Sequence, residues 1–141
     1  MLTARRELKQ RIERLRSIPL VGGCTFDQLA RVDRLGTQIE LREGRILTRE
    51  GAVGRQCFVV LDGTAIAERG GRRLGLIGPG SIAGEMALLD HEPRTATVVA
   101  ETPIRVLVLT DREFFELIQV APCVEAAVDQ IAAARRTALQ P

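Results

Sequence analysis

The hydrophobic positions follow a helical period at both ends of the chain and a period of two in between. Residues 1–36 predict two helices, and residues 111–136 predict two more. Between them, residues 37–110 contain short runs in which apolar and polar side chains alternate, as in half-buried β-strands. The pattern predicts a mainly β protein with helices before and after the strands.

The N-terminal part carries an apolar stripe and a capping signal. Leu8, Ile12 and Leu15 recur at the i, i+4, i+7 spacing of one helical face. Thr25, followed three residues later by Gln28, has the form of a capping box and marks the start of a second helix. Four apolar side chains of this second helix are expected to face the core: Phe26, Leu29, Val32 and Leu35.

The middle part is expected to contain about eight short strands separated by turn residues. Asp62-Gly63 and Gly70-Gly71 are two-residue hairpin signals, and Thr102-Pro103 turns the chain before the last strand. Short, evenly spaced strands with glycine at nearly every corner are typical of a closed β-barrel or a jelly roll. We therefore expect an eight-stranded jelly-roll β-barrel, and its clearest strands lie at 38–42, 45–49, 57–61, 64–69, 72–77, 95–100 and 104–109.

The C-terminal part begins with a second capping box, formed by Thr110 and Glu113. Pro122 suits the first turn of a last helix, which is expected to run to about Arg136. The apolar stripe of that helix consists of Val124, Ala127, Val128 and Ile131.

Composition narrows the class of protein. With 141 residues, 45% hydrophobic and 27% charged, the chain suits one globular domain over residues 1–141. No apolar run approaches the roughly 18 residues that span a bilayer, and the N-terminus lacks the apolar core of a signal peptide. We therefore expect a cytoplasmic protein without a membrane segment. The net charge of +2 is small and the arginines are dispersed, so nucleic acid is not predicted as a direct partner.

Cysteine and histidine give no sign of a metal or disulfide framework. Cys24, Cys57 and Cys123 are far apart and odd in number, so we expect three reduced thiols, with Cys57 in the core of a strand. His91 is the only histidine and lies in a polar turn, whereas a metal site of the cupin type needs several histidine ligands. No metal site and no catalytic residue are predicted.

The most specific chemistry lies in residues 84–98, which we call the cassette. Gly84 and Glu85 precede a short apolar turn, and a polar connection then leads to Arg94 at the head of a strand. The free N–H groups at the start of a helix carry partial positive charge, which suits a phosphate. Arg94 adds a planar fork that can bind two phosphate oxygens. The cassette thus predicts an anion site between a helix start and a strand.

The pattern Gly84-Glu85-x-Ala87-Leu88, five residues, then Arg94-Thr95-Ala96 resembles the phosphate-binding cassette of cyclic nucleotide-binding domains. These domains occur in catabolite-activator-type regulators, kinase regulatory subunits and cyclic-nucleotide-gated channels. The order of helices and strands resembles the whole domain, and glycines stand where the family has them, at Gly44, Gly51, Gly63, Gly78 and Gly80. Ala83 is a departure, because many members have an aromatic residue there.

The resemblance implies a role for each residue of the cassette. Arg94 binds the cyclic phosphate, while Glu85 accepts the ribose 2′-hydroxyl. Thr95 offers its hydroxyl to the phosphate or to a guanine amino group. Both Arg94 and Thr95 can serve only if the strand begins irregularly, because alternate residues of a strand face opposite sides. The remaining cassette residues implied in ligand binding are Gly84, Met86, Ala87 and Ala96.

The resemblance also implies where the purine lies. Ala67, Leu74 and Gly75 are the candidates for the wall behind it, and Arg135 and then Arg136 match a last-helix arginine that caps the base in several relatives. Alternatives in which these residues bind no ligand stay open: Arg94 paired with Glu85, Glu85 solvated in the first helical turn, and a solvated basic C-terminus. Without a ligand, Arg94 is expected to find Glu85 or water.

The leading hypothesis is a stand-alone sensor that binds cyclic AMP or cyclic GMP, with the last helix as a lid and without catalysis. No output segment follows before Pro141, so we expect a protein effector, a homodimer through the N- and C-terminal helices, or a longer parent chain. The main alternative is an interaction module of the same fold that no longer binds nucleotide. An enzyme that uses Glu85 with His91 or Arg94 on a phosphodiester is a weaker third reading.

Overall fold

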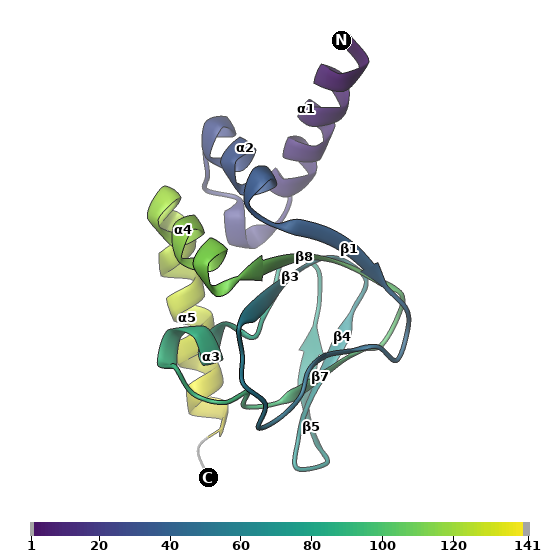
Figure 1. Cartoon of the computed structure of the whole chain (residues 1–141), viewed down its shortest axis with the longest axis vertical. Helices are drawn as coiled ribbons and strands as arrows, with labels where there is room; N and C mark the ends of the chain where they lie inside the picture. The colour runs from purple at the N-terminus through teal and green to yellow at the C-terminus, as the bar shows by residue number, and fades with distance from the viewer. Residues whose placement is uncertain (1, 140–141) are drawn as a thin grey trace.

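Eight antiparallel strands form two four-stranded sheets in the computed structural model, which describes residues 2–139 (Figure 1). One sheet has the order β1-β8-β3-β6 and the other the order β2-β7-β4-β5. The strands are β1 Thr37–Leu41, β2 Ile46–Thr48, β3 Gln56–Asp62, β4 Ala65–Arg69, β5 Arg72–Ile77, β6 Ile82–Ala83, β7 Thr97–Ala100 and β8 Ile104–Thr110.

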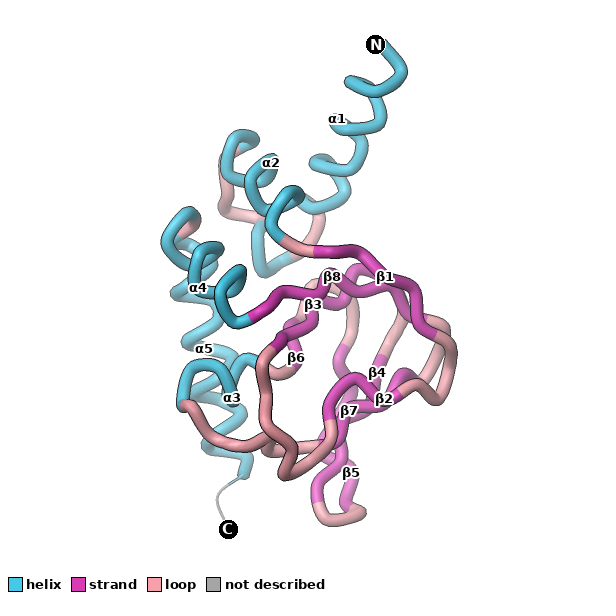
Figure 2. The backbone as a smooth tube through the Cα atoms, viewed as in Figure 1, coloured by secondary structure: helices cyan, strands magenta, loops and turns pink. Residues whose placement is uncertain are grey.

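The strand pairing is that of a jelly roll. β1 pairs with β8, β2 with β7, β3 with β6 and β4 with β5, as in a long antiparallel ribbon that is rolled up. The expected eight-stranded jelly roll is confirmed, in the form of two sheets and not a closed barrel (Figure 2). The side chains of Phe58, Val60, Val98 and Val106 belong to the core of this roll.

Six helical segments flank the roll: α1 Leu2–Arg16, η1 Pro19–Val21, α2 Phe26–Leu35, α3 Glu85–Asp90, α4 Asp111–Val120 and α5 Pro122–Leu139, within the described residues 2–139. Both predicted capping boxes are present. Thr25 and Gln28 exchange bonds of 2.8 and 3.2 Å, and Thr110 and Glu113 exchange bonds of 2.9 and 3.1 Å. The first and last residues of the predicted domain, 1 and 141, lie outside the described part.

The helices form a second core against the outer face of the first sheet. Ile12 and Leu15 of α1, Phe114 of α4 and Val124 of α5 are buried in it. The N-terminal half of α1 projects away from this core (Figure 1), and Leu8 is accordingly 38% exposed. None of the described helices is long and apolar enough to cross a membrane.

One predicted core side chain is wrong. Leu29 and Val32 of α2 are buried, but Phe26 is 43% exposed. Phe26 lies in the first turn of the ten-residue helix, before the stretch in which Leu29 and Val32 pack against the neighbouring helices. Helical spacing places a residue on a face, but it does not say how far the packing partner extends along the helix.

One predicted hairpin is also wrong. Gly70-Gly71 does join β4 to β5, with φ angles of 58° and 77° that suit a type I′ turn. Asp62-Gly63 instead connects β3 in the first sheet to β4 in the second. There the N–H of Thr64 donates to Thr102 Oγ1 at 3.1 Å, so the chain turns a corner against the β7–β8 connection.

Candidate functional site

Within the cassette, residues 85–90 form a short helix, α3, between β6 and β7. β6 pairs with β3 so that Ala83 lies opposite Phe58, and this fixes the point where α3 begins. Gly84 precedes the helix with φ of 89°, a left-handed conformation that glycine adopts with little strain. The side chains of Glu85 and Leu88 are buried beneath the helix, at 1% and 3% exposure.

Backbone hydrogen bonds to residues 51 and 52 fix the position of Arg94. Its N–H donates to Ala52 O at 2.8 Å, and its carbonyl accepts from the N–H of Gly51 at 2.8 Å. The side chain is 8% exposed, and its guanidinium donates to Gly84 O at 3.0 Å and to Gln56 O at 2.6 Å. Burial lowers the pKa of Arg94, an effect that nearby Cys57 and Glu85 oppose. A guanidinium has five N–H donors, so donors remain for a ligand.

Arg94 was expected to pair with Glu85 or with water, and the pairing with Glu85 is wrong. Glu85 accepts two bonds from Nη1 of Arg135 on α5, at 2.6 and 2.7 Å, while Arg94 bonds backbone carbonyls. The alternative in which Glu85 is solvated in the first helical turn is therefore wrong. Arg135 also donates to Ser81 Oγ at 3.3 Å, so its side chain is engaged and not simply solvated.

A second ion pair joins the same two helices. Arg136 Nε and Nη2 donate to the two carboxylate oxygens of Asp90 at 2.9 and 2.6 Å. This contact raises the pKa of Arg136. Two successive arginines of α5 thus bind the first and last residues of α3, which places the last helix directly against the cassette (Figure 1).

Two glycines make room for the guanidinium of Arg94. A Cβ atom on Gly84 would clash with Arg94 Nη1, and one on Gly54 would lie 2.9 Å from Arg94 Cζ and 2.6 Å from Ala87 Cβ. Gly54 was not among the residues predicted for the site. Its role in packing depends on the approach of the 51–55 segment to the cassette, which the sequence spacing does not reveal.

The cassette and β5 border a cavity of about 590 Å³. Eleven of the residues predicted to bind the ligand line it: Ala67, Leu74, Gly75, Gly84, Glu85, Met86, Ala87, Arg94, Thr95, Ala96 and Arg135. Arg136, the second candidate for capping the base, does not line it, because its guanidinium is bound to Asp90. Further lining residues were not predicted: Thr48, Arg72, Arg73, Leu76, Ile77, Ala83 and Val98. Of these, Thr48 is 4% exposed and donates from Oγ1 to Ala96 O at 3.0 Å, so it holds the end of the cassette.

The strand at the end of the cassette begins later than expected. β7 starts at Thr97, and residues 95–96 are bent. Because strict alternation has not begun, Arg94 and Thr95 both face the cavity. The irregular start that both residues required is therefore present.

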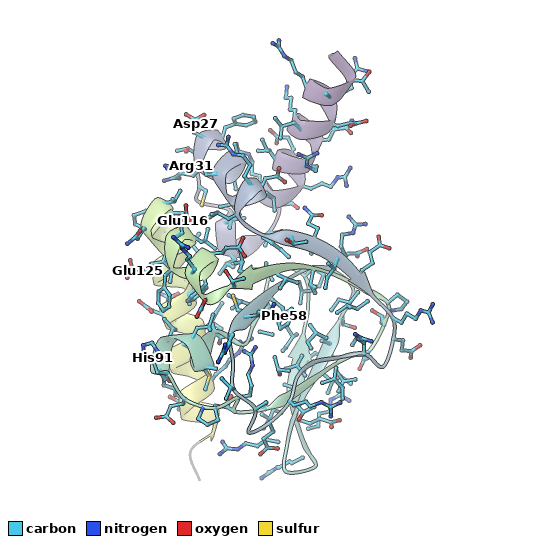
Figure 3. All side chains as sticks on the ribbon, in the orientation of Figure 1. Asp27, Arg31, Phe58, His91, Glu116 and Glu125 are labelled. Atoms are coloured by element: carbon cyan, nitrogen blue, oxygen red, sulfur yellow. The ribbon has the colours of Figure 1, made fainter. Side chains whose placement is uncertain are left out.

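The cavity combines three chemical surfaces. Arg94 offers a cation, Glu85 a buried carboxylate, and Leu74, Leu76 and Ile77 an apolar wall on β5. Such a site suits a small anion that also carries a hydroxyl group and a flat apolar part. Phe58 lies in the interior of the roll in Figure 3, whereas His91 caps the C-terminal end of α3 on the outside. Within residues 2–139, no cluster of potential metal ligands is found.

A comparison with protein families matches residues 38–120, more than half of the chain, to the cyclic nucleotide-binding domain. The chain is 37% identical over 81 residues to the cGMP-dependent protein kinase egl-4 of Caenorhabditis briggsae, covering 57% of this chain and 11% of the kinase. It is 33% identical over 93 residues to a cyclic nucleotide-gated potassium channel of Rhizobium etli, covering 66% of this chain and 26% of the channel.

A solved structure described as cAMP-bound PfPKA-R has a similar fold. The match has a TM-score of 0.85 and 23% sequence identity, and it covers 97% of this chain and 48% of that one. The chain therefore spans only a small part of the kinase and of the channel, and about half of the solved structure.

Proposed function

Because the chain belongs to the cyclic nucleotide-binding domain family, we propose that its cavity binds a 3′,5′-cyclic nucleotide, cyclic AMP or cyclic GMP, and that it acts as a sensor and not as an enzyme. The observation that carries the proposal is the position of Arg94. The residue is 8% exposed, and its guanidinium keeps unused donors and borders a cavity that also contains a carboxylate. Buried charges in proteins are usually paired, whereas the hydrogen-bond partners of the Arg94 side chain within residues 2–139 are neutral carbonyls, so an anion in the cavity would supply the opposite charge.

The phosphate binds Arg94 in this proposal. Charge-assisted hydrogen bonds contribute about 1.5–3 kcal/mol each, and a guanidinium can make two to one phosphate. The backbone N–H groups that follow Gly84 at the start of α3 add a smaller attraction. The two carbonyl bonds of Arg94 already hold its plane, which lowers the entropy that the ligand contact costs.

The ribose binds Glu85, which links the ligand to α5. A carboxylate accepts about four hydrogen bonds, so the 2′-hydroxyl either shares Glu85 with Arg135 or displaces it. Either event changes the contact that holds α5 on the cassette. A ligand shifts a conformational equilibrium only through such a difference in contacts, and this makes α5 the lid.

The purine lies against β4 and β5. Ala67, Leu74 and Gly75 form the wall, and Thr95 offers a hydroxyl that suits the phosphate or a guanine amino group. Arg135 reaches the base only if it leaves Glu85. The chain contains no Trp or Tyr to stack on the ring, so the apolar wall carries most of the base contact.

The output of the sensor is a protein effector or a second copy of the chain, bound through the terminal helices. The N-terminal half of α1 is exposed, and α5 bears the arginines that contact the cassette. Both helices are therefore placed to pass a change at the cavity to a partner.

A second candidate is an interaction module that no longer binds nucleotide. The observation that favours it is that Glu85 already has a cationic partner and Arg94 already has two carbonyl partners within the chain. The site is thus stable without a ligand.

Titration calorimetry with cyclic AMP and cyclic GMP tests the proposal. We expect binding by the wild type, and a loss of two to four powers of ten with Arg94→Ala, from roughly 1.5–3 kcal/mol for each of two bonds. Arg45→Ala is the matched control, since Arg45 is exposed and does not line the cavity. The 2′-deoxy nucleotide should bind more weakly to the wild type, and this difference should shrink in Glu85→Gln.

Three outcomes contradict the proposal in different ways. Folded wild type that takes up neither nucleotide at millimolar concentration supports the interaction module. Equal affinities for wild type and Arg94→Ala mean that the ligand binds elsewhere. Recovery of the ligand as the linear monophosphate supports an enzyme that opens the phosphodiester.

A further inference from the structure

Two cysteines that are 99 residues apart in sequence touch in the fold. Cys24 Sγ and Cys123 Sγ lie 3.2 Å apart. Cys24 lies between η1 and α2, and Cys123 is the second residue of α5, which packs on η1. In Figure 3, the labelled neighbours Asp27 and Glu125 mark the two helices concerned, on the helical side of the molecule.

The two thiols differ in their access to solvent. Cys123 is exposed, whereas Cys24 is 3% exposed. Burial, and then the hydrogen bond to Cys123, raise the pKa of Cys24 to about 12. Cys24 is therefore a neutral thiol at physiological pH, and a dissolved oxidant meets Cys123 first. The third cysteine, Cys57, is fully buried in β3 and takes no part.

We propose that Cys24 and Cys123 are a redox modification site, at which a hydroperoxide converts the two thiols into an intramolecular disulfide. The sulfur of Cys123 attacks one peroxide oxygen, the O–O bond breaks, and Cys123 becomes a sulfenic acid while the alcohol, or water, leaves. The sulfur of Cys24 then attacks the sulfur of Cys123, the thiol proton of Cys24 passes to the S–OH oxygen, and that oxygen leaves as water. Two thiols lose two electrons and two protons, and the peroxide is reduced. A small dithiol reverses the reaction by exchange.

Tertiary packing favours this pairing over intermolecular chemistry. A sulfenic acid on Cys123 forms with its partner sulfur already in contact, so the second step needs no encounter. The backbones are close as well, because a Cβ atom on the adjacent Gly23 would lie 3.7 Å from Cys123 Cβ. The disulfide therefore forms within the native fold.

The modification joins the segment before α2 to the first turn of α5. Arg135 is twelve residues further along α5, roughly 18 Å away, so the disulfide leaves the cavity contacts intact. The covalent link closes a long loop, and we expect it to raise the midpoint of thermal unfolding by roughly 5–15 °C. This inference does not depend on nucleotide binding.

Peptide mapping of the folded full chain tests the proposal. The protein is treated with hydrogen peroxide, its remaining thiols are blocked, and it is digested with trypsin without reduction. We expect one linked pair of peptides, residues 17–31 with residues 113–135, and an intact mass lower by two hydrogen atoms. Reduction with dithiothreitol should restore both the mass and the lower unfolding midpoint.

Single substitutions provide the controls. Cys123→Ser, at an exposed position, should abolish the linked peptides and the rise in the unfolding midpoint, and Cys24→Ala should do the same. Cys57→Ala keeps the pair and should form the same link. The proposal is overturned if folded, oxidised wild type shows only dimers through Cys123, only sulfinic or sulfonic acid on Cys123, a link to Cys57, or unmodified thiols.

Discussion

The ion pair between Arg135 and Glu85 should decide how firmly α5 is held on the cassette. Arg135 Nη1 lies 2.6 and 2.7 Å from the two oxygens of Glu85, whose side chain is 1% exposed, against 30% for Arg135. Arg135→Ala leaves the carboxylate inside the protein without its cationic partner. The variant should therefore be less stable than the wild type, and the loss should come from the buried charge and not from lost surface contacts.

The size of this loss follows from the burial of the two partners. Breaking a fully buried ion pair from one side costs about 3–5 kcal/mol. Arg135 is partly exposed, and its truncation opens a path for water to reach Glu85, so we expect about 1–3 kcal/mol in the free energy of unfolding. For a chain of this length, such a loss lowers the midpoint of thermal unfolding by roughly 3–12 °C.

Thermal unfolding followed by circular dichroism at neutral pH measures the effect. Arg136→Ala is the matched control, because Arg136 and Asp90 are 42% and 35% exposed and water screens their pair, so its loss should be clearly smaller. A double variant, Arg135→Ala with Glu85→Gln, removes the buried charge and should regain part of the stability. Equal losses for the two arginine variants, or a double variant no more stable than Arg135→Ala, would refute the reasoning.

Three further predictions concern packing, capping and pH. Gly54→Ala brings a methyl group within 2.9 Å of the Arg94 guanidinium, and calorimetry should show nucleotide affinity reduced roughly ten- to a hundredfold, whereas Gly78→Ala, with open space around it, should bind normally. Thr110→Ala removes the side-chain bond to the first turn of α4 and should lower the free energy of unfolding by about 1 kcal/mol in urea. Burial raises the pKa of Cys24 to about 12, above its unfolded value of about 8.5. The contribution of the protonated thiol to the free energy of unfolding is therefore complete below pH ~8.5 and is lost as the pH rises toward 12. The unfolding midpoint of Cys24→Ala should fall less steeply over this pH range than that of the wild type.

Features that depend on neighbours in sequence were predictable from the sequence. The capping boxes at Thr25 and Thr110 are contacts between residues three apart, and both are present. The alternation of side chains and the regular glycine corners indicated short strands, and the jelly roll follows from their number and spacing. The cassette was visible because the residues from Gly84 to Arg94 lie within one short segment, whose spacing is itself the signal.

Features that depend on how distant segments meet needed the tertiary structure. Asp62-Gly63 has the local form of a hairpin turn, but the roll separates β3 and β4 into different sheets. The two-residue strand β6 is too short to carry a periodic pattern, and it exists because Ala83 pairs opposite Phe58.

The sequence by itself thus determined the fold class, the cassette and the kinds of side chain within it. Only the tertiary structure decided that Arg135 takes the carboxylate of Glu85, 50 residues away, and that Cys24 meets Cys123. The physical reason is that a carboxylate or a thiol bonds whichever suitable group the packing brings within about 3 Å. The path of α5 back across the cassette sets that distance, and no local pattern encodes it.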